Sequence, residues 1–148
     1  MFPEELQEKP VWRFFKELCR IPRTSGNESA VSQYIEDFAR ERNLECMKDS
    51  QGNLMVKKAG RGEPVVLQAH IDMVGEKIAG SSHDFAVDPI TPELEDGILI
   101  ARETTLGADN GIGVAIMMEL LHGNHPSLPP LECLFTVDEE RGLVGALT

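Results

Sequence analysis

Apolar side chains recur at helical spacing in two segments near the start of the chain. Pro10 precedes the first segment, where its missing N–H is harmless in the first turn of a helix. The apolar positions of the first segment are Val11, Phe14, Phe15 and Leu18. Those of the second segment are Val31, Ile35, Phe38 and Ala39. Both patterns predict amphipathic helices, the first ending at Ile21-Pro22 and the second near Asn43.

The segment before the second predicted helix has the spacing of a capping box. Ser25-Gly26-Asn27-Glu28 places a hydroxyl three residues before a carboxylate. In that motif the serine accepts a hydrogen bond from the amide of the third helical residue, and the glutamate reaches back to the first amide. We therefore expect Ser25 to begin the second helix.

Alternating or continuous apolar runs predict strands farther along the chain. Residues 44–48 and 53–57 flank the turn residues Asp49-Ser50-Gln51-Gly52, which predicts a hairpin. Residues 65–69 are almost continuously apolar, which is typical of a central strand covered on both faces. Residues 131–137 predict a second buried strand.

The segments between the two buried strands complete an α/β pattern. Residues 75–97 are rich in Gly, Ser, Pro and Asp and predict a long loop excursion, followed by a short strand at 98–101. Residues 112–121 are apolar almost all round and predict a buried helix. Helices that alternate with buried strands predict an α/β sandwich with a partly parallel sheet. A new apolar segment begins at residue 143, so we expect the chain to be part of a longer protein.

Composition and charge narrow the function classes. The chain has 148 residues, which fits one domain, and a formal net charge of -11. Such a charge argues against nucleic acid or an anionic membrane as partner. Cys19, Cys46 and Cys133 have no C-x-x-C spacing, and two of them lie in apolar patterns, so we expect buried, reduced thiols. Without a signal peptide or an apolar run of ~20 residues, we expect a cytoplasmic protein with no membrane span.

Three clusters of residues carry candidate chemistry. His70 and Asp72 follow the strand at 65–69, and residues two apart in an extended segment face the same way. Asp72 can therefore hold the far ring nitrogen of a metal-bound His70. The alternative is a histidine at a strand end that is hydrogen-bonded to a nearby acid.

The second cluster is Asp109, which lies among glycines just before the predicted buried helix. It fits a metal ligand or, alternatively, a turn acid that caps the helix. The third cluster, Asp138-Glu139-Glu140, ends the strand at 131–137. Three consecutive carboxylates repel one another unless a cation or solvent relieves them. The alternative is a set of solvated surface acids.

Taken together, the clusters predict a metal site. In α/β sheets, ligands collect at the C-terminal ends of strands, and two of the clusters follow strands. Histidine with carboxylates suits zinc or a similar divalent ion, and a bridging carboxylate suits two ions ~4 Å apart.

Three stretches of the sequence resemble motifs of a known family. They are Gln68-Ala69-His70-Ile71-Asp72-Met73-Val74, residues 104–113, and Thr136-Val137-Asp138-Glu139-Glu140. These stretches look like the N-terminal motifs of the di-zinc metallopeptidase family of aminoacyl-histidine dipeptidase. The resemblance implies a three-layer α/β sandwich with a mixed, mostly parallel central sheet (phosphorylase/hydrolase-like).

The resemblance also implies a role for each site residue. His70, Asp109 and Glu140 would be metal ligands, with Asp109 bridging two divalent ions through a segment whose Asp109–Asn110 peptide bond is cis. Zinc is the expected metal, and the same ligands accept cobalt or manganese. Glu139 would be the general base, and Asp72 would orient His70. The substrate would be a small peptide, above all a dipeptide of the Xaa-His or a broader type.

The family pattern needs another acidic ligand, a distal histidine and an inserted lid domain, which often dimerises. None of these matches a position here, and neither His122 nor His125 lies in a matching motif. We therefore expect residues 1–148 to be the N-terminal portion of a catalytic domain, truncated and without the lid, and inactive in isolation. A homodimer is compatible with the full-length protein. The alternative is a catalytically inert binding or interaction module derived from the peptidase domain.

Overall fold

The computed structural model describes residues 2–7, 9–124 and 126–147. Its helices are α1 (Glu4–Gln7), α2 (Trp12–Arg20), α3 (Ser29–Glu41), α4 (Ala108–His122) and the short 3-10 helix η1 (Val144–Ala146). Its strands are β1 (Glu45–Lys48), β2 (Leu54–Lys58), β3 (Val65–His70), β4 (Glu93–Glu95), β5 (Ile98–Ile100) and β6 (Leu131–Thr136). The predicted helices and strands therefore all occur, with small shifts of their bounds.

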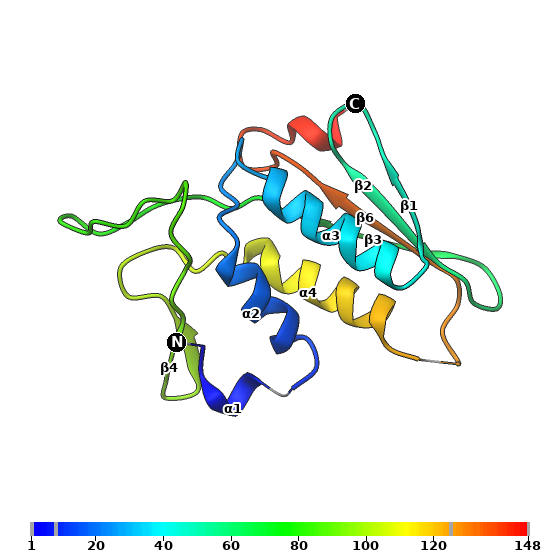
Figure 1. Cartoon of the computed structure of the whole chain (residues 1–148), viewed down its shortest axis with the longest axis horizontal. Coiled ribbons are helices and arrows are strands. Elements are labelled where there is room, and N and C mark those ends of the chain that lie inside the picture. Colours follow the sequence, from blue (N-terminus) through cyan, green and yellow to red (C-terminus); the bar gives the residue numbers. More distant parts are fainter. Residues whose placement is uncertain (1, 8, 125, 148) are drawn as a thin grey trace.

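The central sheet is mixed, as the sequence predicts, and has the strand order β1-β2-β6-β3 (Figure 1). β1 pairs antiparallel with β2, and β2 pairs antiparallel with β6. β3 and β6 form the parallel pair, because the chain between them is long enough to return over the sheet through α4. Antiparallel pairings thus outnumber parallel ones among the described strands, which differs from the mostly parallel sheet that we expected.

The helices cover one face of this sheet. α3 lies over β1 and β2, α4 lies over β3 and β6, and α2 packs against α4 (Figure 1). The described residues place no second helical layer on the opposite face, so the expected three-layer sandwich is represented here by two of its layers. The lid domain is likewise not among the described elements.

Strand β3 shows the consequence of the open face. It forms an edge of the described sheet rather than its centre, and Val66 is 58% exposed. Ala69 points to the opposite face of the sheet from Val66, as Leu67 does, and it is fully buried under α4. An apolar run alone did not distinguish a strand covered on both faces from one that is covered on one face.

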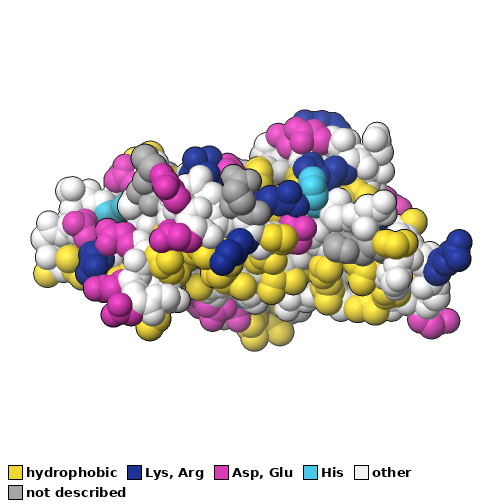
Figure 2. Space-filling model, turned by 90° about the horizontal axis from the view of Figure 1, so that it is seen from below, with side chains coloured by type: hydrophobic (Ala, Val, Ile, Leu, Met, Phe, Trp, Pro, Cys, Tyr) yellow, Lys and Arg dark blue, Asp and Glu magenta, His cyan; other side chains and the backbone are white. Residues whose placement is uncertain are grey.

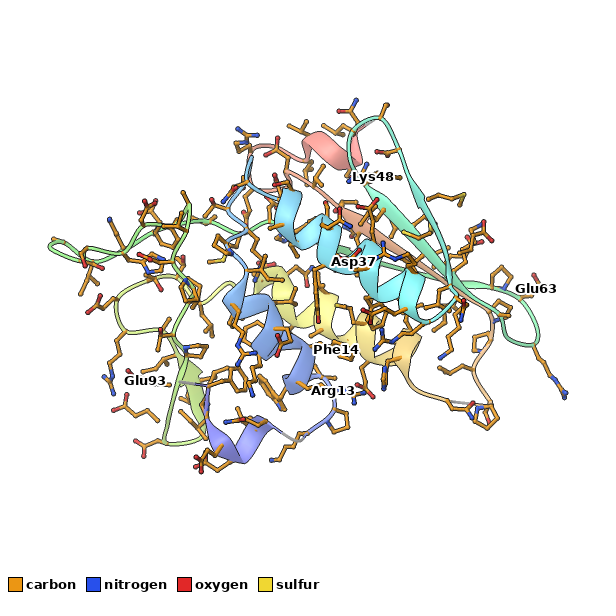
Figure 3. The ribbon with its side chains drawn as sticks, viewed as in Figure 1. Arg13, Phe14, Asp37, Lys48, Glu63 and Glu93 are labelled. Atoms are coloured by element: carbon orange, nitrogen blue, oxygen red, sulfur yellow. The ribbon has the colours of Figure 1, made fainter. Side chains whose placement is uncertain are left out.

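The core lies between the helices and the covered face of the sheet. Phe14 points from α2 toward α3, where its ring forms an edge-to-face contact with Phe38 at a centroid distance of 5.5 Å (Figure 3). Glu63, by contrast, lies on a loop outside this core (Figure 3). From β2 and β6, Val56, Cys133 and Phe135 complete this core with no exposed surface. The helical stripes predicted from the sequence are therefore the core-facing sides of α2 and α3.

The excursion between β3 and α4 extends away from the main body (Figure 1). It is less irregular than predicted, because β4 and β5 form an antiparallel hairpin within it and Lys77 pairs with Thr104. Seen from below, hydrophobic side chains form a band along the molecule beside groups of charged side chains (Figure 2). In the described part of the chain, no helix is long and apolar enough to cross a membrane.

The cysteines agree with the prediction of free thiols. Cys19 and Cys133 are buried, Cys46 is half-buried, and none of the three forms a disulfide. Burial raises the pKa of Cys19 to about 12, against a smaller opposing effect of the Arg23 charge. Cys19 and Cys133 are therefore part of the packed core.

Two valines on opposite faces of the sheet test which face is covered. Val56→Ala removes two methyl groups beneath the helices, so we expect a loss of about 2–3 kcal/mol in the free energy of unfolding. Val66→Ala on the open face should cost less than about 0.5 kcal/mol. Urea unfolding of the two variants and the parent chain measures both values. Equal losses would mean that the open face is covered in solution.

Candidate metal centre

The parallel pairing of β3 and β6 brings two of the three predicted clusters together. In the register, His70 lies opposite Thr136, so both strands end at the same edge of the sheet. Asp72 follows the end of β3, and Asp138-Glu139-Glu140 follows the end of β6. The N-terminal turn of α4 brings Asp109 to the same edge, where ligands of α/β sheets collect.

The side chains predicted as ligands converge at this edge. His70 Nε2 lies 3.1 Å from Asp109 Oδ1 and 3.9 Å from Glu139 Oε2. His70, Asp109 and Glu140 each offer one ligand atom, and these atoms all lie within 4.8 Å of one another. One imidazole nitrogen with carboxylate oxygens is a donor set that suits zinc and similar divalent ions. The residues therefore fit a metal ion.

The carboxylate of Asp72 lies directly behind this cluster and has no exposed surface. Its oxygens accept hydrogen bonds from Ser25 Oγ at 2.7 Å and from the backbone N–H groups of Glu139 at 3.1 Å and Glu140 at 3.2 Å. His70 Nδ1 lies 3.3 Å from Asp72 Oδ1. Four donors thus converge on one buried acid, and together they come from three separate segments of the chain.

These contacts explain the shifted pKa values of the pair. Burial works against ionisation of Asp72, but the hydrogen bonds from His70, Ser25 and the two amides outweigh it and hold the pKa of the acid well below its usual range. The hydrogen bond to Asp72 raises the pKa of His70 to about 9, against burial and with help from Asp109. In the absence of metal, the pair is therefore an ion pair at neutral pH.

The surroundings of His70 also fix which ring nitrogen can bind a metal. Nδ1 faces two acceptors, the Asp72 backbone carbonyl at 3.1 Å and the Asp72 carboxylate. Nδ1 must therefore carry a proton, which leaves the lone pair of the neutral ring on Nε2. Nε2 is the nitrogen that faces Asp109, so the tautomer and the position of the acids agree.

The capping box predicted at Ser25 is wrong. α3 begins at Ser29, and its N-cap Glu28 makes no side-chain capping bond. Ser25 donates to Asp72 instead, and Glu28 Oε1 accepts from the backbone N–H of Asp138 at 3.2 Å. Both residues of the motif therefore serve the site rather than the helix. The spacing could not reveal this, since their partners lie more than 40 residues away in the sequence.

Local contacts also distinguish between the roles considered for Asp138 and Asp109. Asp138 forms an ion pair with Arg141, so a protein cation relieves part of the repulsion among the three consecutive acids. The N-cap of α4 is Gly107, and no side chain caps this helix end. Asp109 is thus no conventional cap, and its bond to Asn110 is cis, as the family resemblance implied.

The centre is accessible from solvent on the Asp109 side. The side chain of Asp109 is 86% exposed, whereas that of His70 is only 7% exposed. Asp109 and Glu140 line a pocket of about 310 Å³, whose other lining residues are Val74, Thr105, Leu106, Gly107 and Ala108. The side of the centre formed by His70 and Asp72 is therefore buried, and the side formed by Asp109 and Glu140 is open to solvent.

The remaining histidines lie apart from these contacts. His122 ends α4, where its Nδ1 accepts from Arg42 Nε at 3.1 Å and its ring meets Phe14. His83 contacts Phe85 in the excursion. His125 lies outside the described residues.

Comparisons with known proteins agree with this geometry. The sequence model of a protein family, peptidase family M28, matches residues 53–148, which contain all three predicted clusters. The chain is 40% identical to the cytosol non-specific dipeptidase of Escherichia coli over 147 residues, which cover 96% of this chain and 30% of that protein. The chain thus spans less than a third of this relative's length.

Solved structures show the same arrangement of elements. The aminoacylhistidine dipeptidase of Vibrio alginolyticus superposes with a TM-score of 0.92 at 42% identity, covering 97% of this chain and 30% of that one. The aminopeptidase PepT of Bacillus cereus superposes with a TM-score of 0.75 at 25% identity, covering 94% of this chain and 39% of that one. The fold is therefore that of a peptidase.

Replacing Asp72 tests how much its buried carboxylate stabilises the fold. With chelator present, Asp72→Asn should lower the free energy of unfolding at neutral pH by about 2–4 kcal/mol, because charge-assisted hydrogen bonds are lost in a buried place. The pKa of Asp72 is depressed in the folded state, so its contribution is present above about pH 4 and is lost as the pH falls below that. Urea unfolding of both chains across this range should show the difference shrinking in acid. A difference that stayed constant would contradict the account.

Proposed function

Because the chain belongs to peptidase family M28, we propose that it carries the metal-binding and general-base residues of a metal-dependent dipeptidase. The observation that carries the proposal is the convergence of the ligand atoms of His70, Asp109 and Glu140 within 4.8 Å, at the edge where β3 and β6 end and α4 begins. The two acids are exposed and contribute little to the core, so their convergence on a buried histidine supports a shared cation.

His70 Nε2 and the carboxylates of Asp109 and Glu140 would hold the ion. Asp109 has two carboxylate oxygens and is open to solvent, which suits it to bridge two ions. A divalent metal ion, zinc in the first place and cobalt or manganese as alternatives, would polarise the peptide carbonyl and lower the pKa of a water.

The position of Glu139 supports a role as the general base. Its Oε2 lies 3.9 Å from His70 Nε2, so its carboxylate faces the same volume as the ligands without belonging to their closest group. Its backbone N–H is tied to Asp72, which fixes where its side chain begins. We propose that Glu139 accepts a proton from the attacking water and then donates it to the leaving amine.

Asp72 acts through His70 in this mechanism. It keeps the proton on Nδ1 and thereby directs the lone pair of Nε2 toward the metal. The negative charge of Asp72 also makes Nε2 of the imidazole a stronger electron-pair donor to a metal ion. The hydroxyl of Ser25 and two backbone amides hold the acid in place, so the ring has little freedom to turn.

The names of the relatives support dipeptides as substrates and the cytoplasm as the location. We propose that residues 1–148 form the N-terminal portion of a di-zinc catalytic domain, whose additional acid and histidine ligands lie in the part of the relatives that the chain does not span. Side-chain preference would depend on that part and on the lid. A homodimer is a further proposal for a protein of the relatives' length.

Metal binding by the chain itself tests the ligand assignment. We expect weak zinc binding by calorimetry, because three protein ligands make an incomplete site. His70→Ala and Asp109→Asn should each weaken it by at least about tenfold, since each removes a ligand. His122→Ala is the matched control and should leave it unchanged. A chain that binds no zinc, or variants that bind as well as the parent, would favour the inert binding module.

The pKa of His70 predicts how this binding depends on pH. Because hydrogen bonding to Asp72 raises the pKa of His70 to about 9, the ring is protonated at neutral pH before metal binds. Binding must then release one proton, so the apparent affinity should rise by about tenfold per pH unit up to about pH 9. Calorimetry in buffers of different ionisation enthalpy measures the proton. Release of no proton between about pH 6 and pH 8 would contradict the assignment of His70.

Hydrolysis separates the peptidase from the inert module. The 148-residue chain should show negligible turnover of dipeptides, because three ligands leave the metal shell incomplete. The product of the complete reading frame should hydrolyse them, with loss of activity on chelation and recovery with zinc. In that product, Glu139→Gln should lower kcat by at least about a hundredfold with metal content unchanged. Full activity of this variant would exclude Glu139 as the base.

A further inference from the structure

Arg23 is a buried cation beside the proposed metal centre. It lies in the loop between α2 and α3 and is 2% exposed. An arginine is rarely buried unless its charge and its N–H groups have partners. Burial lowers the pKa of Arg23, and its interactions with Cys19 and Asp72 partly oppose this effect. The contacts of its guanidinium must therefore compensate for the burial of this charge.

The guanidinium of Arg23 joins the two loops that carry His70 and Asp109. Nη1 donates to the backbone carbonyls of Ile71 at 3.0 Å and Asp72 at 3.2 Å, directly after β3. Nη2 donates to the carbonyl of Gly107 at 2.5 Å, at the N-terminal end of α4. One planar group thus connects the segment that follows one ligand to the segment that precedes the other.

Two glycines near Asp109 make room for this group. A Cβ at Gly107 would lie 2.6 Å from Arg23 Nη2, and a Cβ at Gly111 would lie at the same distance from that atom. A real Cβ atom essentially never lies this close to another heavy atom. Glycines on both sides of Asp109 therefore let the helix start approach the guanidinium, and Gly107 also has a positive φ of 70°.

The backbone around Arg23 is fastened to the same loop. Its carbonyl accepts from the N–H of Met73 at 3.1 Å, and Thr24 forms a parallel bridge with Met73. Two residues after Arg23, Ser25 donates to the carboxylate of Asp72. Arg23 is thus anchored at its backbone on the β3 side and reaches across to α4 with its side chain.

We infer that Arg23 is a positioning residue that sets the spacing between His70 Nε2 and the carboxylate of Asp109. The inference rests on the proposed function, in which these two groups share a metal. Asp109 follows Gly107 by two residues, so a shift of the Gly107 carbonyl moves Asp109 with it. Metal centres lose affinity when ligands move by a fraction of an ångström, because coordination distances are narrow.

Lysine cannot replace this function. The planar fork of arginine presents two nitrogens in fixed directions, one toward each loop, whereas a lysine has a single nitrogen on a flexible stem. Arg23→Lys therefore keeps a cation in the loop but loses the connection between the loops. Arg23→Gln is a second variant, which keeps hydrogen-bonding groups without the charge.

The experiment compares Co²⁺ binding by the 148-residue chain and its variants, followed by the visible absorption of the bound ion. Arg23→Lys and Arg23→Gln should weaken Co²⁺ binding by about tenfold or more and alter the absorption bands, as outer-shell changes do. Val56→Ala is the control, because it destabilises the core without touching the centre. It should leave the affinity and the spectrum unchanged.

A metal-free measurement makes the inference independent of metal binding. NMR of the histidine rings in the parent chain and in Arg23→Lys should show changed signals for His70 and constant signals for His122, whose contacts are with Arg42 and Phe14. If the parent chain fails to bind Co²⁺, the proposed function fails, and the ring signals still decide the inference.

Two results would overturn the role of Arg23. The first is folded Arg23 variants that bind Co²⁺ within twofold of the parent chain, or that leave the His70 signals unchanged where the parent binds no ion. The second is loss of the folded state in both variants, judged by circular dichroism, which would make Arg23 a residue of the fold rather than of the centre.

Discussion

The ionised carboxylate of Asp72 is the constraint on which the rest of this region depends. A buried charge is expensive unless donors surround it, and here the donors come from separate parts of the chain. Ser25 comes from the loop before α3, the amides of Glu139 and Glu140 from the end of β6, and the ring of His70 from β3. Satisfying this one acid therefore fixes the relative positions of three segments, and two of the proposed ligands and the proposed base lie on them.

The sheet supplies the geometry that this arrangement needs. Parallel pairing of β3 with β6 sets His70 opposite Thr136, so that both chains leave the sheet at one edge. An antiparallel pairing would have sent the residues after the two strands to opposite edges. Asp109 reaches this edge from α4, outside the sheet, and the Asp72 network does not hold it. The contacts of Arg23 with Gly107 and with the loop after β3 link this third group to the other two.

Local patterns in the sequence predicted most elements, because each pattern reports on a few neighbouring residues. The hairpin of β1 and β2 follows from its turn, where the Asp49 carboxylate accepts hydrogen bonds from three successive amides. The resemblance of three motifs predicted His70, Asp109 and Glu140 as one group. Ser25 and Arg23 were beyond reach of this reasoning, since their partners are far away in the sequence. Val66 was misjudged for a related reason, because a run of apolar residues does not reveal what lies on each face of a strand.

The division of the centre into a buried and an open wall has a chemical meaning. Asp72, Ser25 and Arg23 orient the proposed metal-binding residues. They lie on the buried side or border it, where a low dielectric strengthens hydrogen bonds. Asp109 and Glu140, which contribute charge, lie where solvent can reach them. An ion at this centre would therefore be held rigidly from behind by His70 and would face solvent through its acids. Such an asymmetry lets one side of a metal be fixed by the protein while the other remains free for exchange of ligands, which catalysis at a metal requires.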